Sequence, residues 1–264
     1  MKRFFKGLKG SYIALVLLFL YSPIAIMIIL SFNEGKSRAN WQGFSLKWYA
    51  SLLDNSKLMD ALEVTLIVAF AATLASVVLG TLGAIGIHAC KKKYSTALIN
   101  LSYLPMTMPD IVTGVSLMMM MVFINKYLFN LPRGMFTMIL AHITFDTPYV
   151  LFSVLPKLRQ MDPNTYEAAL DLGCTPMEAI TDVIIPEIKP GIITGALLAL
   201  TMSLDDFVIS YFTGGYVQNL SVVVYSAAKL GVTPDMYAMS TIMFVTVLTL
   251  LIVVNKRSTL ESIS

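Results

Sequence analysis

Six long apolar segments constrain what this chain can fold into. They lie near residues 11–31, 59–87, 97–124, 135–155, 186–212 and 237–254, and polar stretches separate them. Each is long enough for a helix to cross the hydrocarbon core of a bilayer, which takes about 20 residues. Only 13% of the residues are charged and the mean hydropathy is +0.74, whereas soluble domains are about a quarter charged. The sequence therefore predicts an all-α, polytopic membrane protein, a single transmembrane domain over 1–264 with six membrane-spanning helices.

The distribution of basic residues predicts how the chain is oriented. If the N-terminus is cytoplasmic, twelve of the 19 lysines and arginines lie in cytoplasmic segments. Cytoplasmic connections carry an excess of these residues, so we expect both termini in the cytoplasm of a bacterial cell. Cys90 and Cys174 then fall in cytoplasmic loops, where thiols stay reduced.

The longest polar connection on the predicted cytoplasmic side, residues 157–185, has a helical pattern. Asp162 and Pro163 suit a helix start, and Gly173 suits a helix end that needs a left-handed residue. Thr175 and Glu178 have the spacing of a capping box at the start of a second helix. We expect that second helix to lead to Pro186, where the fifth span begins. The loop is acidic, whereas helices that lie on anionic lipid are usually basic, so the pattern favours docking of a cytoplasmic protein partner.

The same loop carries a resemblance to a known family. "EAALDLGCTPMEAITDVIIP" resembles the signature of permease subunits of bacterial ATP-binding-cassette importers: Glu-Ala-Ala, three residues, Gly, nine residues, Ile-x-Leu-Pro. Val183 and Ile185 stand where the pattern has Ile and Leu, and both departures are conservative. The resemblance covers essentially the whole chain, because the common core of such permeases has six spans with both termini inside.

The resemblance implies a coupling segment and a set of partners. The residues that it assigns to ATPase coupling are Tyr166, Glu167, Ala168, Ala169, Asp171, Gly173 and Pro186. It implies that the chain is not itself an enzyme and holds no cofactor, since two copies of a partner ATPase subunit bind ATP and Mg. A homologous permease subunit and an external binding protein complete the implied complex. Lipid surrounds the spans, and nothing in the sequence indicates a nucleic-acid partner.

Further stretches narrow the resemblance. "NWQGFSLKWYASLL", "MTMPDIVTGVSLM", "AHITFDTPYVL" and "SLDDFVISYFTGG" look like the corresponding stretches of the second permease subunit of spermidine/putrescine importers. The implied function is ATP-driven import of polyamines by alternating access. Permeases for thiamine, ferric iron, sulfate or molybdate share the cytoplasmic signature, so that signature alone does not separate these substrates.

Carboxylates inside the apolar segments bear on the substrate. Asp205 and Asp206 interrupt the fifth span, and a charge at the centre of a bilayer costs at least about 2.5 kcal/mol on insertion scales. Placed on one continuous helix, Thr194, Thr201 and Asp205 form one polar stripe, and Ser203, Asp206 and Ser210 form a second one. One aspartate can then line a path while the other meets a neighbouring helix.

Two further carboxylates and an aromatic residue complete the predicted path. Asp110 follows Pro105 and Pro109, where a broken helix would expose carbonyls to a cavity. Asp146 lies four residues after His142, and an internal hydrogen bond of that pair is as good an interpretation as a transport role. The predicted substrate-path residues are Asp110, Asp146, Asp205, Asp206 and Tyr211. Carboxylates with aromatic walls suit a cation.

Other classes of function fit less well. Oxyanion permeases have no use for an acidic lining, whereas thiamine and ferric iron are cationic competitors. A stand-alone cation channel leaves the acidic cytoplasmic loop without a purpose. An intramembrane aspartyl protease would use two facing aspartates, but Gly-x-Gly-Asp is absent from the sequence. With only two histidines and two cysteines, the sequence offers no clustered ligand set for a structural zinc.

Overall fold

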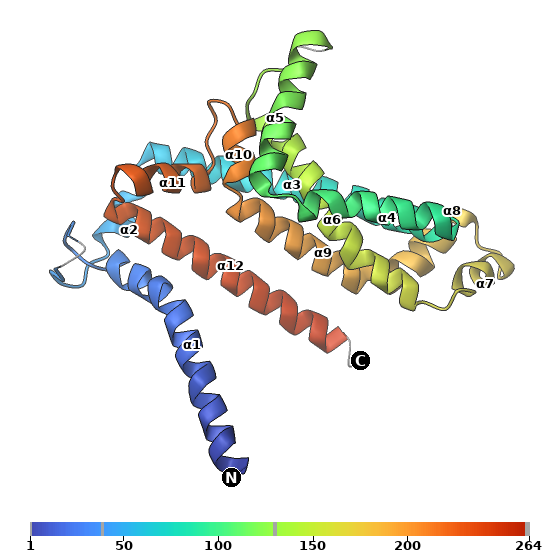
Figure 1. Cartoon of the computed structure of the whole chain (residues 1–264), viewed down its shortest axis with the longest axis horizontal. Coiled ribbons are helices and arrows are strands. Elements are labelled where there is room, and N and C mark those ends of the chain that lie inside the picture. Colours follow the sequence, from blue (N-terminus) through green and yellow to red (C-terminus); the bar gives the residue numbers. More distant parts are fainter. Residues whose placement is uncertain (1, 38–39, 129–130, 262–264) are drawn as a thin grey trace. The chain divides into compact units, whose positions relative to one another are not determined.

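A computed structural model describes residues 2–37, 40–128 and 131–261. Over these residues the secondary structure is helical apart from one isolated bridge, Asn33 to Phe44, which confirms the all-α prediction (Figure 1). The helices are α1 (Lys2–Ser31), α2 (Lys47–Ser51), α3 (Ser56–Ala89), α4 (Lys92–Thr107), α5 (Asp110–Tyr127), α6 (Met135–Gln160), α7 (Thr165–Asp171), α8 (Pro176–Glu178), the π-helix η1 (Ala179–Ile184), α9 (Ile185–Asp205), α10 (Val208–Thr213), α11 (Leu220–Leu230) and α12 (Pro234–Glu261).

Six helical runs in the described part of the chain are long and apolar enough to cross a membrane. They are Tyr12–Ser31, Ser56–Ala89, Asp110–Tyr127, Met135–Gln160, Pro176–Asp205 and Pro234–Ile252. The predicted number of spans is confirmed. Two of the predicted spans differ in extent, because the third is broken and the fifth begins earlier and ends sooner.

The third predicted span, 97–124, consists of two helices rather than one. The chain is extended at Met108, with ψ of 145°, and α5 begins after Pro109. Proline lacks the N–H that would continue the helix, and its ring pushes the preceding residue out of the helical region. The broken helix expected near the two prolines is therefore confirmed at Pro109, whereas Pro105 lies inside α4.

The fifth predicted span, 186–212, ends at Asp205. Asp206 has an extended conformation, with φ −63° and ψ 122°, and a separate short helix, α10, follows. The carboxylate of Asp206 accepts hydrogen bonds from the backbone N–H groups of Ile209 (3.1 Å) and Ser210 (2.7 Å). The second predicted stripe is therefore wrong, because Ser210 belongs to another helix. The three residues of the first stripe, Thr194, Thr201 and Asp205, all lie on α9.

The chain divides into two compact units. The first comprises residues 1–59 and 226–256, and the second comprises residues 60–225 and 257–264. In the first unit Asn33 organises the connection after α1: its Oδ1 accepts from the backbone N–H of Gln42 (2.9 Å), and its carbonyl accepts from Nε1 of Trp48 (2.7 Å). Asn55 donates to Asp235 (2.6 Å), which ties the start of α3 to the start of α12. The single domain over 1–264 stays a prediction.

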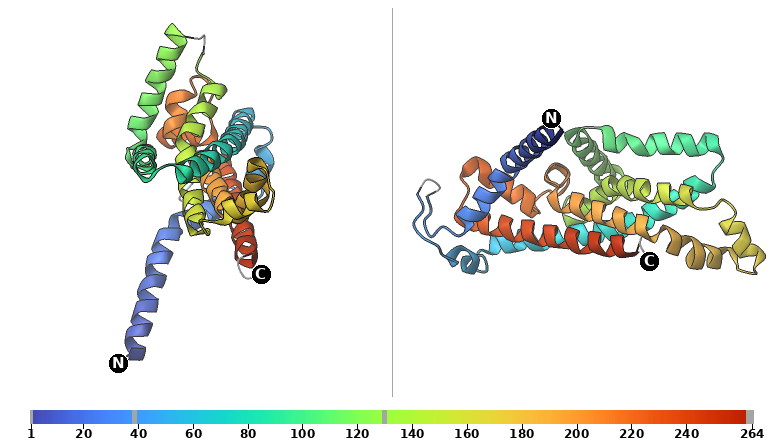
Figure 2. Two further views of the ribbon diagram at one scale, coloured as in Figure 1. Left: turned by 90° about the vertical axis from the view of Figure 1, so that its right-hand side faces the viewer. Right: turned by 90° about the horizontal axis from the view of Figure 1, so that it is seen from below.

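The second unit is built on the packing of α6 against α9, which lie side by side in Figures 1 and 2. Gly195 allows this approach, since a Cβ atom there would lie 2.9 Å from Cα of Val150. Buried apolar side chains of both helices, among them Val154 and Ile188, form the core between them. The segment containing α7 and α8 projects beyond the ends of these helices.

Candidate functional site

The first part of the predicted coupling segment is the short helix α7, and hydrogen bonds define its end. The N–H of Cys174 donates to the carbonyl of Ala169 (3.1 Å), and the N–H of Gly173 donates to that of Leu170 (2.9 Å), which is the Schellman arrangement. Gly173 has φ of +98°, and a Cβ atom there would meet nothing within 4 Å. Glycine is therefore required by the positive φ and not by a lack of space for a side chain. The predicted left-handed helix end is confirmed.

The predicted start of this helix is wrong by two residues. Helix α7 begins at Thr165, and Asp162 instead accepts a hydrogen bond from the N–H of Asn164 (2.9 Å) across Pro163. Asp162 thus closes a turn before the helix. For an aspartate, such a hydrogen bond to the nearby backbone is an alternative to capping the helix.

The second part of the segment begins with the predicted capping box. The N–H of Thr175 donates to Oε2 of Glu178 (2.7 Å), and the N–H of Glu178 donates to Oγ1 of Thr175 (3.3 Å). The second helix leads to Pro186 as predicted, but the predicted start of the fifth span at that residue is not a helix boundary, since α8 continues through η1 into α9 without a break. The π turn changes the hydrogen-bond register just before Pro186, which has no N–H to donate. The helical segment that begins at Pro176 is therefore continuous with the span.

The surface of this segment combines charge with exposed apolar side chains. Glu167, Ala168 and Asp171 are exposed, Tyr166 is half-buried, and Ala169 is buried and packs α7 against the rest of the unit. Leu172 is 87% exposed, directly before the glycine turn. Sequence reasoning missed Leu172, although a leucine at the end of a polar helix was a local signal. Exposed apolar side chains rimmed by charge are typical of protein contacts.

The two aspartates at the end of α9 have different surroundings. Asp205 is exposed, whereas the Asp206 side chain is only 9% exposed and its Oδ2 lies 3.4 Å from Nε2 of His142 on α6. The predicted contact of one aspartate with a neighbouring helix is thus confirmed for Asp206, while the lining of a path by Asp205 stays a prediction.

His142 is the centre of a buried polar cluster around that contact. Its Nδ1 lies 2.6 Å from Oγ of Ser203, and its Nε2 lies 2.9 Å from Oγ of Ser210. Asn219 adds two hydrogen bonds, to the carbonyl of Asp206 (2.9 Å) and to Oγ of Ser210 (2.8 Å). The cluster fixes the break between α9 and α10. Asn219 lies outside the apolar spans, so no periodic pattern could reveal it.

Asp146 does not form the internal hydrogen bond with His142 that was one interpretation of the sequence. Its side chain is completely buried, and neither carboxyl oxygen has a hydrogen-bond partner within the described residues. It lies within electrostatic range of Asp206. Asp146 is thus enclosed by the chain in this conformation.

A cluster of aromatic rings begins two residues after the exposed Asp205 in the sequence. The Phe207 ring centroid lies 4.0 Å from that of Tyr225 and 5.5 Å from that of Tyr211, and Tyr211 is 57% exposed. Asp205 is also the last residue of α9, where the partial negative charge of the helix end adds to the carboxylate. Together these features favour a cation with apolar parts.

Asp110 is the first residue of α5 and is exposed. The hydroxyl of Tyr149 lies within electrostatic range of both Asp110 and Asp146. An acidic residue at a helix start also interacts favourably with the helix dipole, so Asp110 has a structural contribution whatever it binds.

Over residues 2–37, 40–128 and 131–261, no three His, Cys, Asp or Glu side chains group as metal ligands.

The fold and the site define a class of protein: a polytopic membrane transport subunit with a projecting helical segment. Residues 76–256 match the family described as "Binding-protein-dependent transport system inner membrane component", and the chain belongs to that family.

Named relatives and solved structures are similar to most of the chain. The chain is 37% identical over 227 residues to the putrescine transport system permease protein PotI of Escherichia coli (strain K12), covering 85% of this chain and 81% of that protein. It is 36% identical over 254 residues to the spermidine/putrescine transport system permease protein PotC of Haemophilus influenzae, covering 96% of both. The same fold occurs in a chain of a bacterial alginate ABC transporter that was solved in complex with an alginate-bound periplasmic protein. The TM-score is 0.73 and the identity is 18%. The match covers 97% of this chain and 93% of that one.

Proposed function

We propose that this chain is a transmembrane permease subunit of an ATP-driven importer that moves polyamines into the cytoplasm. The relatives named for putrescine and spermidine support this substrate class. The observation that carries the proposal within the chain is the exposed carboxylate of Asp205 at the end of α9, directly before a segment in which the Phe207 ring contacts those of Tyr211 and Tyr225.

The chemistry of a polyamine matches this arrangement. Its ammonium groups are separated by methylene runs, so it needs carboxylates for the charges and aromatic or apolar walls between them. Asp205 supplies a carboxylate at a helix end that is already negative, and Tyr211 offers an exposed ring face. An oxyanion would be repelled by both the carboxylate and the helix end.

The remaining acidic residues divide by exposure. Asp110, exposed at the start of α5, is proposed as a second point of cation contact. Asp206 holds α10 and His142, so its proposed contribution is to keep Asp205 facing the path. Asp146 is enclosed in this conformation and would join the path only after α6 and α9 move apart.

Energy for transport would come from partner subunits. Two ATPase subunits, which bind ATP and Mg, would contact the segment from Thr165 to Gly173 on the cytoplasmic side. The exposed Glu167, Asp171 and Leu172 offer charged and apolar contacts for that purpose. A homologous permease would complete the path, and an external binding protein would deliver the substrate. Closure of the ATPases would then alternate the access of the path between the two sides.

Uptake of labelled spermidine into proteoliposomes that contain the purified complex tests this proposal. Uptake that requires ATP inside the vesicles and yields to unlabelled putrescine but not to thiamine is the expected result. ATP hydrolysis without spermidine accumulation would overturn the polyamine assignment, and inhibition by thiamine or ferric iron would identify the alternative. Flux without ATP would instead indicate a channel.

A further inference from the structure

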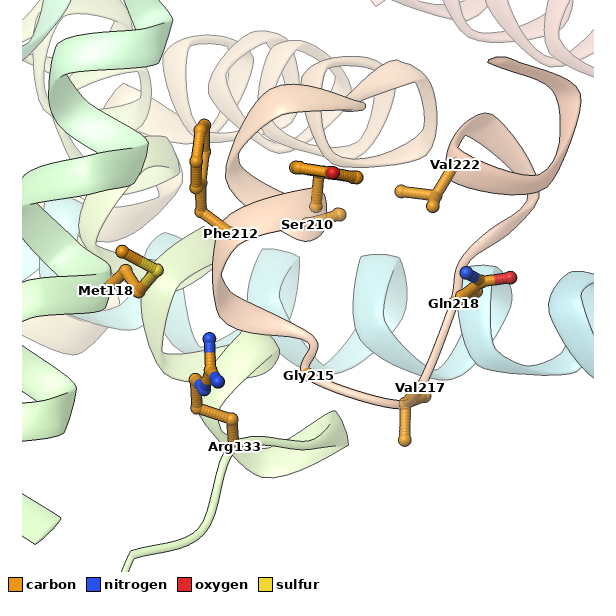
Figure 3. Close-up of a pocket in the computed structure, with 9 residues that line it drawn as sticks. Met118, Arg133, Ser210, Phe212, Gly215, Val217, Gln218 and Val222 are labelled. Atoms are coloured by element: carbon orange, nitrogen blue, oxygen red, sulfur yellow. The ribbon is translucent and has the colours of Figure 1, made fainter. Parts of the chain in front are cut away.

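A cavity of about 360 Å³ lies beside α10 in the second unit (Figure 3). Its lining residues come from α5, the segment before α6, α10, the turn after it and α11: Met118, Arg133, Ser210, Tyr211, Phe212, Gly215, Val217, Gln218 and Val222. Arg133 extends into the space between Met118 and Gly215, and Gln218 lies on the other side of the turn. The cavity shares Tyr211 with the proposed substrate contact, but neither Asp205 nor Phe207 lines it.

The segment that carries Arg133 is held firmly against this turn. Oγ1 of Thr137 donates to the carbonyl of Thr213 (2.8 Å) and accepts from the N–H of Gly134 (2.8 Å). Gly215 has φ of +62°, and a Cβ atom there would lie 2.9 Å from the carbonyl oxygen of Arg133. The backbone at Arg133 is therefore fixed relative to the cavity before any ligand binds, which reduces the entropy lost on binding.

The charge of the cavity excludes the proposed substrate. Arg133 is the one charged residue of the lining, and no carboxylate in the described part of the chain lies within ion-pair distance of it. A guanidinium repels ammonium groups but binds a carboxylate through two parallel hydrogen bonds. Gln218 adds an amide that can donate a further hydrogen bond. The cavity thus fits an acidic side chain.

The position of the cavity identifies which partner can reach it. Arg133 lies two residues before Met135, the first residue of α6. The coupling segment follows Gln160, the last residue of the same helix. Helix α6 has 26 residues. At 1.5 Å per residue it is about 39 Å long, enough to separate its ends across a membrane. The cavity therefore lies at the opposite membrane face from the coupling segment, which is the face that a binding protein approaches.

From this geometry we infer that the Arg133 cavity receives an aspartate or glutamate side chain of the external binding protein. The inference rests on the coupling segment being cytoplasmic and is independent of which substrate is transported. Docking is measured as the affinity of the purified binding protein for the permease complex in nanodiscs of zwitterionic phosphatidylcholine. Replacing Arg133 by Glu should raise the dissociation constant at least tenfold, and Arg133→Lys should have a smaller effect because the charge is kept.

Lys126 provides the matched control. It lies at the last turn of α5, with its ammonium 5.0 Å from the Tyr127 ring centroid and outside the cavity lining. Lys126→Glu makes the same change of net charge and should shift affinity less than threefold. Equal effects of the two reversals would overturn the inference, because general electrostatics would then explain both.

A second measurement does not depend on affinity. In the Arg133→Lys variant a carbodiimide should couple the new amine to a carboxylate of the docked binding protein, giving an amide that mass spectrometry locates. Arg133→Gln has no amine and should give no such product. Absence of coupling in Arg133→Lys, with docking intact, would also overturn the inference. An Arg133→Glu defect that appears only in nanodiscs containing anionic lipid would assign the cavity to a lipid headgroup instead.

Discussion

Nε2 of His142 lies 3.4 Å from Oδ2 of Asp206, which joins the middle of α6 to the break between α9 and α10. Both groups are buried, and Ser203 and Ser210 complete the hydrogen bonds of the imidazole. Replacing His142 by Ala leaves the buried Ser203 hydroxyl without this partner, at about 1–3 kcal/mol, and removes one contact each from Ser210 and Asp206. We expect the melting temperature of the purified complex to fall by several degrees. Thr144→Ala, at an exposed position of the same helix, should leave it unchanged; equal melting of the two variants would remove His142 from this structural role.

The adjacent aspartates should respond differently to the same substitution. Asp205→Asn removes an exposed carboxylate, so we expect normal assembly and about tenfold weaker uptake, consistent with one charged contact. Asp206→Asn replaces one of the two oxygens that accept from the α10 N–H groups by an NH2 group, so loss of thermal stability should come first. Parallel measurements of uptake and melting temperature separate the two effects. Wild-type uptake by Asp205→Asn would exclude that residue from the path.

Asp146 offers a test of an unsatisfied buried carboxyl. Asp146→Leu replaces it by an apolar side chain of similar size, which should raise the melting temperature, since removing an unpaired buried polar group is favourable. Uptake should fall if Asp146 gains a partner during transport. A variant that is both more stable and fully active would leave Asp146 without a transport role.

The glycine after α7 should be needed for coupling. Gly173→Ala forces φ of +98° on a residue with a Cβ atom, at roughly 1 kcal/mol or more, and it should disturb the turn that presents Leu172. We expect ATP hydrolysis by the complex to continue while uptake per ATP falls. Cys174→Ala, at the next residue, should keep the ratio of uptake to hydrolysis. An unchanged ratio in Gly173→Ala would contradict the proposed contact with the ATPase.

The native cysteines report the orientation. Cys90 is exposed, Cys174 is half-buried, and both are free thiols. A maleimide that does not cross membranes should label neither in intact spheroplasts and should label Cys90 after permeabilisation. Gln218→Cys, in the turn beside the Arg133 cavity, should be labelled without permeabilisation. Labelling in the reverse pattern would invert the proposed topology.

Local patterns in the sequence predicted the features that depend on neighbouring residues. Apolar runs predicted six spans, and the Thr175–Glu178 pair and Gly173 predicted a cap and a helix end, because each acts within a few residues. The cluster around His142 joins residues 61 and 68 positions apart in sequence, and no local period reports such contacts. The break at Asp206 was not predicted, for a related reason. Hydropathy averaged over the whole span does not reveal a single residue with an extended backbone.

The helical run from Pro176 to Asp205 has a mechanical consequence. It is 30 residues long, and its α8–η1 part runs at an angle to α9 (Figure 1). Its first turn carries the Thr175–Glu178 cap, and its last residue is Asp205. A push on the capped end would therefore reach Asp205 through one unbroken helical run rather than across a loop. The two ends of that run lie at the proposed sites of ATPase contact and of substrate contact.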